Sequence, residues 1–127
     1  MNQPLAWIAV GIGAALGAWL RWALSVFLGG LHSYVQLGTL AANLVGGYLI
    51  GLALGFFGDH AGLAPAWRLF VITGFLGGLT TFSSFSGESM VLLQRGAYGW
   101  ALAHTALHLL GAIGFCIAGF ATWRAIA

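Results

Sequence analysis

Side chains that could hold an ion gather in one short stretch, TGFLGGLTTFSSFSGE at residues 73–88, which lies between two apolar runs. The stretch contains four glycines, six hydroxyl residues, three phenylalanines and one carboxylate. Thr81, Ser84 and Glu88 stand at i, i+3 and i+7, so on a helix they share one face. Hydroxyls donate or accept hydrogen bonds and a carboxylate accepts them. The spacing therefore favours a polar strip. Glu88 has two open placements, the membrane interface or a water-filled vestibule.

Phe82 and Phe85 are three residues apart and adjoin that strip. Phenylalanines inside an apolar segment usually face lipid or the protein core. An aromatic ring, however, carries a negative face and a positive edge. Rings that present their edges to the strip could stabilise a small anion without a full positive charge, and would hold it loosely enough to let it move.

The second apolar run carries Thr39 and Asn43, four residues apart and hence on one helical face. A side-chain amide both donates and accepts hydrogen bonds, so Asn43 suits an interhelical bond, an anion or a cation. Residue chemistry alone leaves these roles open.

His104 and His108 stand four residues apart in the last apolar run, close enough to share a metal ion, but no third ligand lies nearby in the sequence. Polar residues that line a helix interface or the rim of a pore are therefore the better interpretation. Arg21, near the end of the first run, has the same two placements as Glu88. Ionisable groups within membrane segments are functional candidates by default.

Composition places all these groups in a membrane protein. Charged residues make up 5% of the 127, against roughly a quarter in a soluble domain. A formal charge of +2 without a basic stripe argues against nucleic-acid binding. No nucleophile–base pair or phosphate-binding fingerprint stands out, so we expect no enzyme. The charged residues are Arg21, Asp59, Arg68, Glu88, Arg95 and Arg124.

Hydropathy divides the chain into four runs long enough to cross a bilayer core of about 30 Å, which needs about 20 residues per helix. Short, turn-rich breaks separate them, so the helices should be close neighbours. We expect an all-α membrane protein with a single four-helix domain over residues 1–127. The expected spans are about 5–28, 37–57, 67–93 and 99–125.

The third span is expected to break near Gly77-Gly78. Between Arg68 and Arg95 lie 26 residues, about 39 Å of straight helix, more than the hydrocarbon thickness. Glycine costs about 1 kcal/mol in a helix relative to alanine. Close packing through Gly74 and Gly78 is the alternative use of these glycines. A break would free main-chain carbonyls that can coordinate a hard cation such as Na⁺.

Positive charge gives no orientation signal. With four spans, Arg68 and Arg124 fall on one side of the membrane, and Arg95 and Arg21 on the other. Since positive residues near span ends set topology, a two-against-two tally favours insertion in both orientations, although subtler cues could fix one. Four helices are few for a functional unit, so we expect a dual-topology antiparallel homodimer.

Three stretches together resemble the signature motifs of the Fluc, or CrcB-type, fluoride channels: GAALGAWLR (13–21), GTLAANLVGG (38–47) and GFLGGLTTFSSFSGE (74–88). The likeness extends to chain length and span count. It implies a fluoride-selective channel that exports fluoride passively through two antiparallel pores and reduces fluoride toxicity. It also implies a multi-pass protein of the bacterial inner membrane, with itself, fluoride and lipid as partners.

The resemblance also implies roles for individual residues. Phe82 and Phe85 match the pore phenylalanines whose ring edges meet fluoride, and Asn43 matches the pore asparagine. Gly77 and Thr80 would offer main-chain carbonyls to a structural Na⁺ at the dimer interface. The remaining candidates are Thr81, Ser84 and Glu88 in the polar lining of the pathway and Arg21 near a vestibule.

The fourth span departs from that pattern. Family members often carry a track of hydroxyl residues there, whereas this chain reads HTALHLLGAIGFC at 104–116. His108 stands in the register of the hydroxyls, so it or Thr105 is expected to take their place, and His104 is a further candidate for the track.

Two other function classes fit less well. A four-helix proton-coupled exporter needs a carboxylate in its first span, and this chain has none there; Glu88 is the candidate carboxylate within the spans. A structural subunit of a larger complex would suit the small-residue motifs, but it would leave Asn43 and the hydroxyl cluster without a role.

Overall fold

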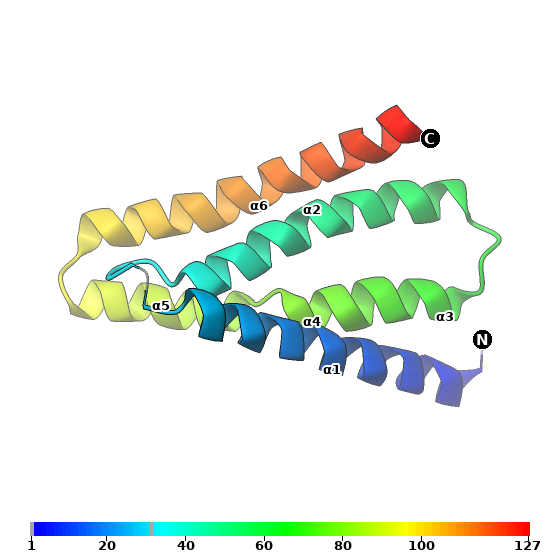
Figure 1. Cartoon of the computed structure of the whole chain (residues 1–127), viewed down its shortest axis with the longest axis horizontal. Coiled ribbons are helices and arrows are strands. Elements are labelled where there is room, and N and C mark those ends of the chain that lie inside the picture. Colours follow the sequence, from blue (N-terminus) through cyan, green and yellow to red (C-terminus); the bar gives the residue numbers. More distant parts are fainter. Residues whose placement is uncertain (1, 31) are drawn as a thin grey trace.

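The computed structural model describes residues 2–30 and 32–127, and its described part is all-helical. Spans that follow one another in the chain run in opposite directions, so the first and third spans are parallel, as are the second and fourth, and both termini lie at the same end of the molecule (Figure 1). The expected four membrane spans are confirmed. They are α1 (Gln3–Leu28), α2 (Leu37–Asp59), a third span of α3 (Pro65–Arg68), η1 (Leu69–Leu76), α4 (Gly77–Leu79) and α5 (Phe82–Gln94), and α6 (Tyr98–Ile126).

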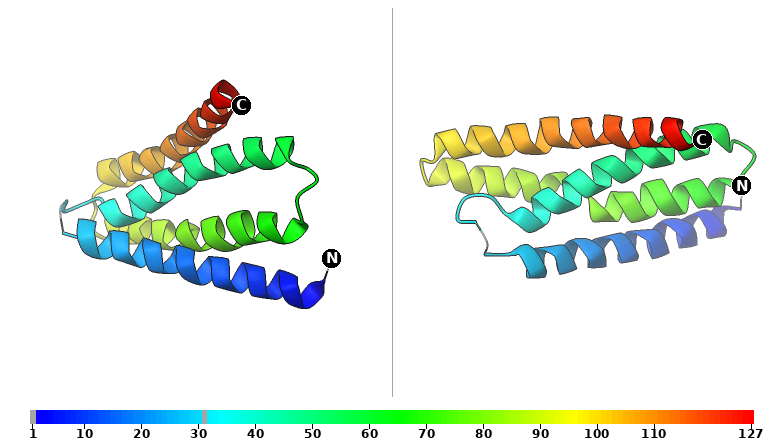
Figure 2. Two further views of the ribbon diagram at one scale, coloured as in Figure 1. Left: turned by 45° about the vertical axis from the view of Figure 1, so that its right-hand side comes forward. Right: turned by 45° about the horizontal axis from the view of Figure 1, so that its top comes forward.

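The third span changes partner halfway along its length. Its first half, η1 and α4, packs against α1, whereas α5 packs against α6. The helix α2 lies between α1 and α6 and contacts both, as the two turned views make clear (Figure 2). Two different surfaces therefore meet at the middle of the third span.

Glycines form the contact between α1 and the first half of the third span. A Cβ placed on Gly74 would lie 2.8 Å from the carbonyl oxygen of Val10, and one on Gly13 would lie 2.8 Å from the Phe75 nitrogen. Gly17 and Gly78 are equally close to opposing backbone. Small residues at helix contacts let backbones approach closely in a bilayer, so the packing role considered for Gly74 and Gly78 is confirmed.

Close glycine contacts also join α2 to α6. A Cβ on Gly47 would lie 2.6 Å from the Ala112 carbonyl oxygen, and Gly51 and Gly119 also face backbone of the other helix. Since lipid tails are as apolar as leucine, such close van der Waals contact replaces the hydrophobic effect as the source of helix association.

The third span breaks near the glycine pair, as expected, but at Thr80–Thr81. Gly77 and Gly78 stay helical, and Thr80 (φ −83°, ψ 155°) and Thr81 (φ −150°, ψ 118°) are extended. The reason is contact: Gly78 is pressed against Ala14 of α1, so its lack of a side chain serves packing. Before the break, η1 is a π-helix, a form that often appears at functional sites.

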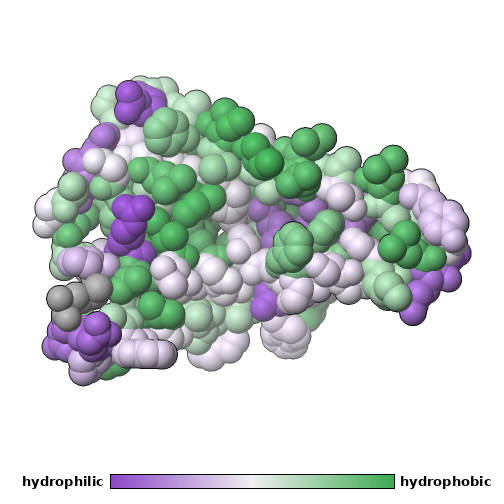
Figure 3. Space-filling model, turned by 180° about the vertical axis from the view of Figure 1, so that it is seen from behind, coloured by the Kyte–Doolittle hydropathy of each residue, from purple (hydrophilic) through white to green (hydrophobic). Residues whose placement is uncertain are grey.

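The exterior is suited to lipid. Hydrophobic side chains cover much of the length of the face in Figure 3, and hydrophilic residues gather toward its two ends with a few in between. Large apolar residues are widely exposed, for example Trp7 at 77%. Exposed apolar area on this scale is unusual for a soluble monomer, and the chain is a multi-pass membrane protein.

Candidate ion pathway

Asn43 forms hydrogen bonds with the main chain at the break in the third span. Its side-chain oxygen accepts a hydrogen bond from the Thr81 main-chain N–H at 2.8 Å, and its amide nitrogen donates to the Thr81 carbonyl at 3.1 Å. The asparagine side chain thus pairs with both polar groups of one peptide residue in the third span. A buried unpaired main-chain group costs about 1–3 kcal/mol, so this pairing lets the chain leave helical geometry within the membrane.

Two carbonyls lose their helical partners through this arrangement. In a continuous helix the Thr81 N–H would donate to Gly77 and the Ser84 N–H to Thr80. Here Thr81 donates to Asn43, and Ser84 donates to Thr81 Oγ1 at 3.1 Å as an N-cap. The carbonyls freed at the break therefore include those of Gly77 and Thr80, the pair that the family resemblance assigns to Na⁺.

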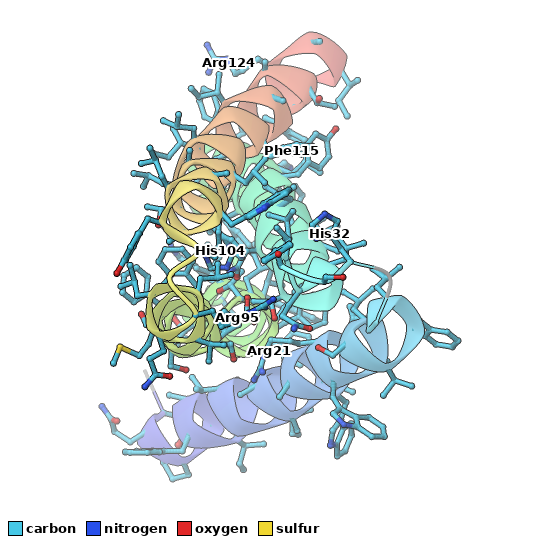
Figure 4. The ribbon with its side chains drawn as sticks, turned by 90° about the vertical axis from the view of Figure 1, so that its left-hand side faces the viewer. Arg21, His32, Arg95, His104, Phe115 and Arg124 are labelled. Carbon is cyan, nitrogen blue, oxygen red and sulfur yellow. The ribbon has the colours of Figure 1, made fainter. Side chains whose placement is uncertain are left out.

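Arg21 reaches the same break from α1. Its Nε donates to the Gly78 carbonyl at 3.2 Å, and Figure 4 shows the side chain extending from α1 toward the third span. An arginine stem can lie along apolar surface while its charged head finds a polar partner. Arg21 therefore compensates a third main-chain carbonyl at the break and brings a positive charge there.

A cavity of about 600 Å³ opens beside the break. One side of it is apolar, formed by α2 and α6 residues such as Ile50, Leu109 and Ile113. Gly77 lies on its wall, and a Cβ there would meet only the Ile72 carbonyl oxygen, at 3.7 Å. The polar and aromatic residues that line it are Asn43, Thr80, Thr81, Phe82, Phe85, Thr105 and His108.

The two phenylalanines lie at the mouth and the wall of this cavity. Phe82 is 80% exposed, and its ring centroid lies 5.4 Å from that of Phe85. Phe85 stacks on His104 with centroids 5.0 Å apart and planes 13° apart. Because the imidazole covers one face of the Phe85 ring, the edge and the other face remain for contact with anything in the cavity.

Glu88 lies one turn beyond the cavity lining, in a hydrogen-bonded cluster. Its Oε2 accepts from the Thr39 hydroxyl at 2.6 Å, and its Oε1 lies 3.1 Å from His104 Nε2. The side chain of Glu88 is 17% exposed and His104 is fully buried. Figure 4 shows His104 between α6 and the third span. Of the sequence candidates, the structure joins Glu88 with His104 and leaves Ser84 outside the cavity lining.

The hydrogen-bond pattern around His104 favours a proton between its Nε2 and Glu88 Oε1. The Ser89 hydroxyl donates to the Phe85 carbonyl at 3.0 Å, so its oxygen accepts from His104 Nδ1–H, 3.1 Å away. With Nδ1 protonated, a neutral His104 would turn a bare Nε2 lone pair toward the carboxylate. A proton between Nε2 and Oε1 turns that repulsion into a charge-assisted hydrogen bond.

Comparison with known proteins places this chain in a family. The model of the family described as CrcB-like protein, Camphor Resistance (CrcB), matches residues 8–120. The chain belongs to the CrcB family. It is 60% identical over 124 residues to a protein of Cupriavidus pinatubonensis named fluoride-specific ion channel FluC, with 98% of each chain covered.

Other relatives of this CrcB protein carry the same name. The one from Ralstonia pickettii is 57% identical over 120 residues, covering 94% of this chain and 95% of its own. The one from Burkholderia pseudomallei is 57% identical over 118 residues, covering 93% and 91%. The name of these relatives describes a channel, and a channel moves ions and is not an enzyme, in agreement with the expectation from the sequence.

The structure brings a third potential metal ligand to the two histidines of this CrcB protein. Ligand atoms of Glu88, His104 and His108 lie within 4.8 Å of one another. The sequence offered no third ligand because Glu88 is on another helix. However, the Asn43 amide nitrogen lies 3.0 Å from His108 Nδ1 and donates to it, so the proton of a neutral His108 is on Nε2. As arranged, the trio does not present three lone pairs to a cation.

The sequence analysis did not predict two hydrogen-bond partners of the Glu88–His104 pair. Ser89 orients His104, and Thr39, considered only alongside Asn43, is a partner of Glu88. The available signal was spacing: Thr39 is one helical turn before Asn43 on α2, so both reach the third span, one at the carboxylate and the other at the break.

Proposed function

We propose that this chain is a fluoride-selective channel that lets fluoride leave the cell passively across the bacterial inner membrane and so reduces its toxicity. The observation that carries the proposal is the agreement between two facts. Relatives that match nearly the whole chain are named fluoride-specific channels. In this chain, aromatic rings and hydroxyls line a cavity at a helix break.

The lining suits an ion that is hard to dehydrate. Fluoride must exchange its water for other donors, and conduction requires sites that are favourable enough to enter but weak enough to leave. In the proposed pathway the donors are the ring edges of Phe82 and Phe85 and the hydroxyls of Thr81 and Thr105. Ser84, Glu88 and His104 would continue the polar route beyond the cavity, and Arg21 would attract the anion toward it.

We further propose that the working unit is an antiparallel homodimer of two oppositely inserted copies. With Arg21 at the break, the span ends carry Arg68 and Arg124 on one side and Arg95 on the other, a difference too small to favour one orientation strongly. The open cavity and the 80% exposed Phe82 lie on a surface that a second copy would cover. An axis in the membrane plane would bring the two helix breaks together at the centre.

A structural Na⁺ fits this centre. The Gly77 and Thr80 carbonyls are the ones whose helical N–H partners are diverted to Asn43 and Thr81. Carbonyl oxygens are suitable ligands for a hard cation, and two copies would provide four of them. The residues present therefore fit Na⁺, which would neutralise carbonyl dipoles that otherwise repel one another across the axis.

Fluoride efflux from liposomes tests the proposal. The protein is reconstituted with internal fluoride or, in a matched preparation, chloride, and release is followed with ion-selective electrodes. We expect rapid loss of fluoride, retention of chloride, and slower fluoride loss through Phe82→Ile. Retention of both anions by well-folded, dimeric protein would contradict the proposal.

A further inference from the structure

We propose that His108, through its Nε2–H, is a fluoride donor of this pathway, and that Asn43 is a positioning residue that fixes the imidazole tautomer. This inference rests on the proposed fluoride function and concerns how this chain carries it out. It differs from the assignment of Asn43 as an ion ligand that the family motif suggests.

The first step is the orientation of the Asn43 amide. Oxygen and nitrogen of a side-chain amide are usually distinguished only by their partners. Here the partners are the N–H and the carbonyl of Thr81, whose donor and acceptor roles are fixed. The oxygen must therefore face the N–H, at 2.8 Å, and the nitrogen must face the carbonyl, at 3.1 Å.

The second step counts the donors of that amide. Its nitrogen has two hydrogens. One is donated to Thr81, and the other is directed at His108 Nδ1, 3.0 Å away. Asn43 consequently has no hydrogen left for an anion in the cavity, although it lies on the cavity wall.

The third step follows the proton on His108. Because Nδ1 accepts from Asn43, the ring is neutral and its proton is on Nε2; an imidazolium would set Nδ1–H against the Asn43 N–H. His108 is 5% exposed, and its Nε2 is buried without a hydrogen-bond partner among the described residues. A buried unpaired donor is costly, so this N–H is expected to serve a ligand that accepts hydrogen bonds.

The surroundings select an anion as that ligand. An N–H cannot bind a cation, and the wall beside it contains the Phe85 ring, whose centroid lies 4.9 Å from that of His108. The lining also contains the Thr105 hydroxyl and the exposed Phe82. A neutral N–H, a hydroxyl and ring edges offer partial positive charge without a full one, which suits a small monovalent anion that must bind and leave.

Histidine labelling of the full-length protein in lipid bilayers tests this assignment. Solid-state nitrogen NMR distinguishes protonated from unprotonated ring nitrogens, and the His108 signals are identified by their loss in His108→Gln. We expect Nε2–H with bare Nδ1 in wild type, and an Nε2 signal that moves when fluoride is added but not when chloride is added. In Asn43→Asp the carboxylate accepts a hydrogen bond, so the proton should move to Nδ1.

Fluoride efflux provides the functional comparison. His108→Met removes the donor and should slow efflux by roughly tenfold or more, in the range of one hydrogen bond to an ion. His108→Gln keeps an N–H donor and should retain most of the flux. His60→Gln is the matched control, since His60 lies at the far end of α2 and, among the described residues, its side chain hydrogen-bonds only to the Phe56 carbonyl.

The outcomes separate this inference from the proposed function. If wild type conducts fluoride but the His108 proton is on Nδ1, its Nε2 signal ignores fluoride, or His108→Met conducts normally, the inference is overturned and the channel remains. If neither the wild type nor any variant conducts fluoride, the proposed function and the inference fail together. If zinc alone moves the His104 and His108 signals together and fluoride does not, the cluster with Glu88 is a metal site and the anion assignment is wrong.

Discussion

The two halves of the third span share one membrane crossing but are built in opposite ways. The first half, η1 and α4, is pressed onto α1, with Gly74 and Gly78 placed against backbone. The second half, α5, meets α6 through polar and aromatic side chains, and its Phe82 is 80% exposed. In the first half, glycines let the backbone approach α1 closely, whereas the contact of the second half with α6 is made by polar and aromatic side chains.

The difference shows how a small membrane protein can expose polar chemistry without losing its fold. Backbone-to-backbone contact fixes the first half, so the chain can leave helical geometry at Thr80–Thr81 at a defined point. Beyond that point, hydrogen bonds pass from the main chain to Asn43 and Thr81. We call η1 and α4 the rigid half, because close backbone contact fixes them on α1, and α5 the polar half. The polar half carries the proposed ion pathway.

Gly17→Val should have the largest effect, because it disrupts the contact between α1 and the first half of the third span. A Cβ at Gly17 would overlap the Phe75 carbonyl and lie 2.7 Å from the Leu79 nitrogen, and backbone cannot give way as a side chain can. We expect a loss of about 3 kcal/mol, near the upper end of overpacking effects, seen as aggregation or a lowered Tm in detergent. Gly11→Ala on the same helix is the control, since nothing lies within 4 Å of its Cβ. Equal damage from both variants would refute the account of this contact.

Asn43→Leu should have the next largest effect, because it removes the link between the halves. The Thr81 N–H and carbonyl would both lose their partner, at about 1–3 kcal/mol for each buried group. We expect a loss of about 2–4 kcal/mol and little fluoride efflux. Chemical denaturation with parallel efflux assays checks this, and an unchanged unfolding midpoint would show that the Thr81 contacts are dispensable.

Glu88 substitutions should have the smallest effects and sharpen the description of the polar half. In Glu88→Gln the amide oxygen can accept from Thr39. Its nitrogen can donate to Nε2 of a neutral His104 whose proton is on Nδ1, so stability should stay within about 0.5 kcal/mol of wild type. Glu88→Ala leaves both partners unpaired and should cost about 1–3 kcal/mol. Thermal unfolding in detergent compares them, and a larger loss in Glu88→Gln would mean that the negative charge itself is needed.

The sequence predicted the spans and the break because each depends on local chemistry. Hydropathy and turn residues place the four helices, and glycine and threonine mark the weak region of the third span. The break was placed at Gly77-Gly78 because glycine propensity ignores tertiary contact, whereas Gly78 is helical and packed on Ala14.

The candidate site was predicted only as a set of residues. Asn43 meets Thr81 across 38 positions and His104 meets Glu88 across 16. Such contacts depend on how the helices are rotated and shifted relative to one another, which one sequence does not determine. For the same reason, the contact of His104 Nε2 with Glu88 and the unpaired Nε2 of His108 could only be found once their neighbours were in place.

The most direct test of the division between the halves makes the same substitution in each. Phe82→Ile lies in the polar half and Phe70→Ile in the rigid half, and fluoride efflux from liposomes is measured for both at equal amounts of dimeric protein. We predict at least a tenfold loss in Phe82→Ile, because the proposed ring-edge contact with the ion is removed, and near wild-type efflux in Phe70→Ile. Equal losses in the two variants, or a loss only in Phe70→Ile, would contradict the assignment of ion conduction to the second half of the third span.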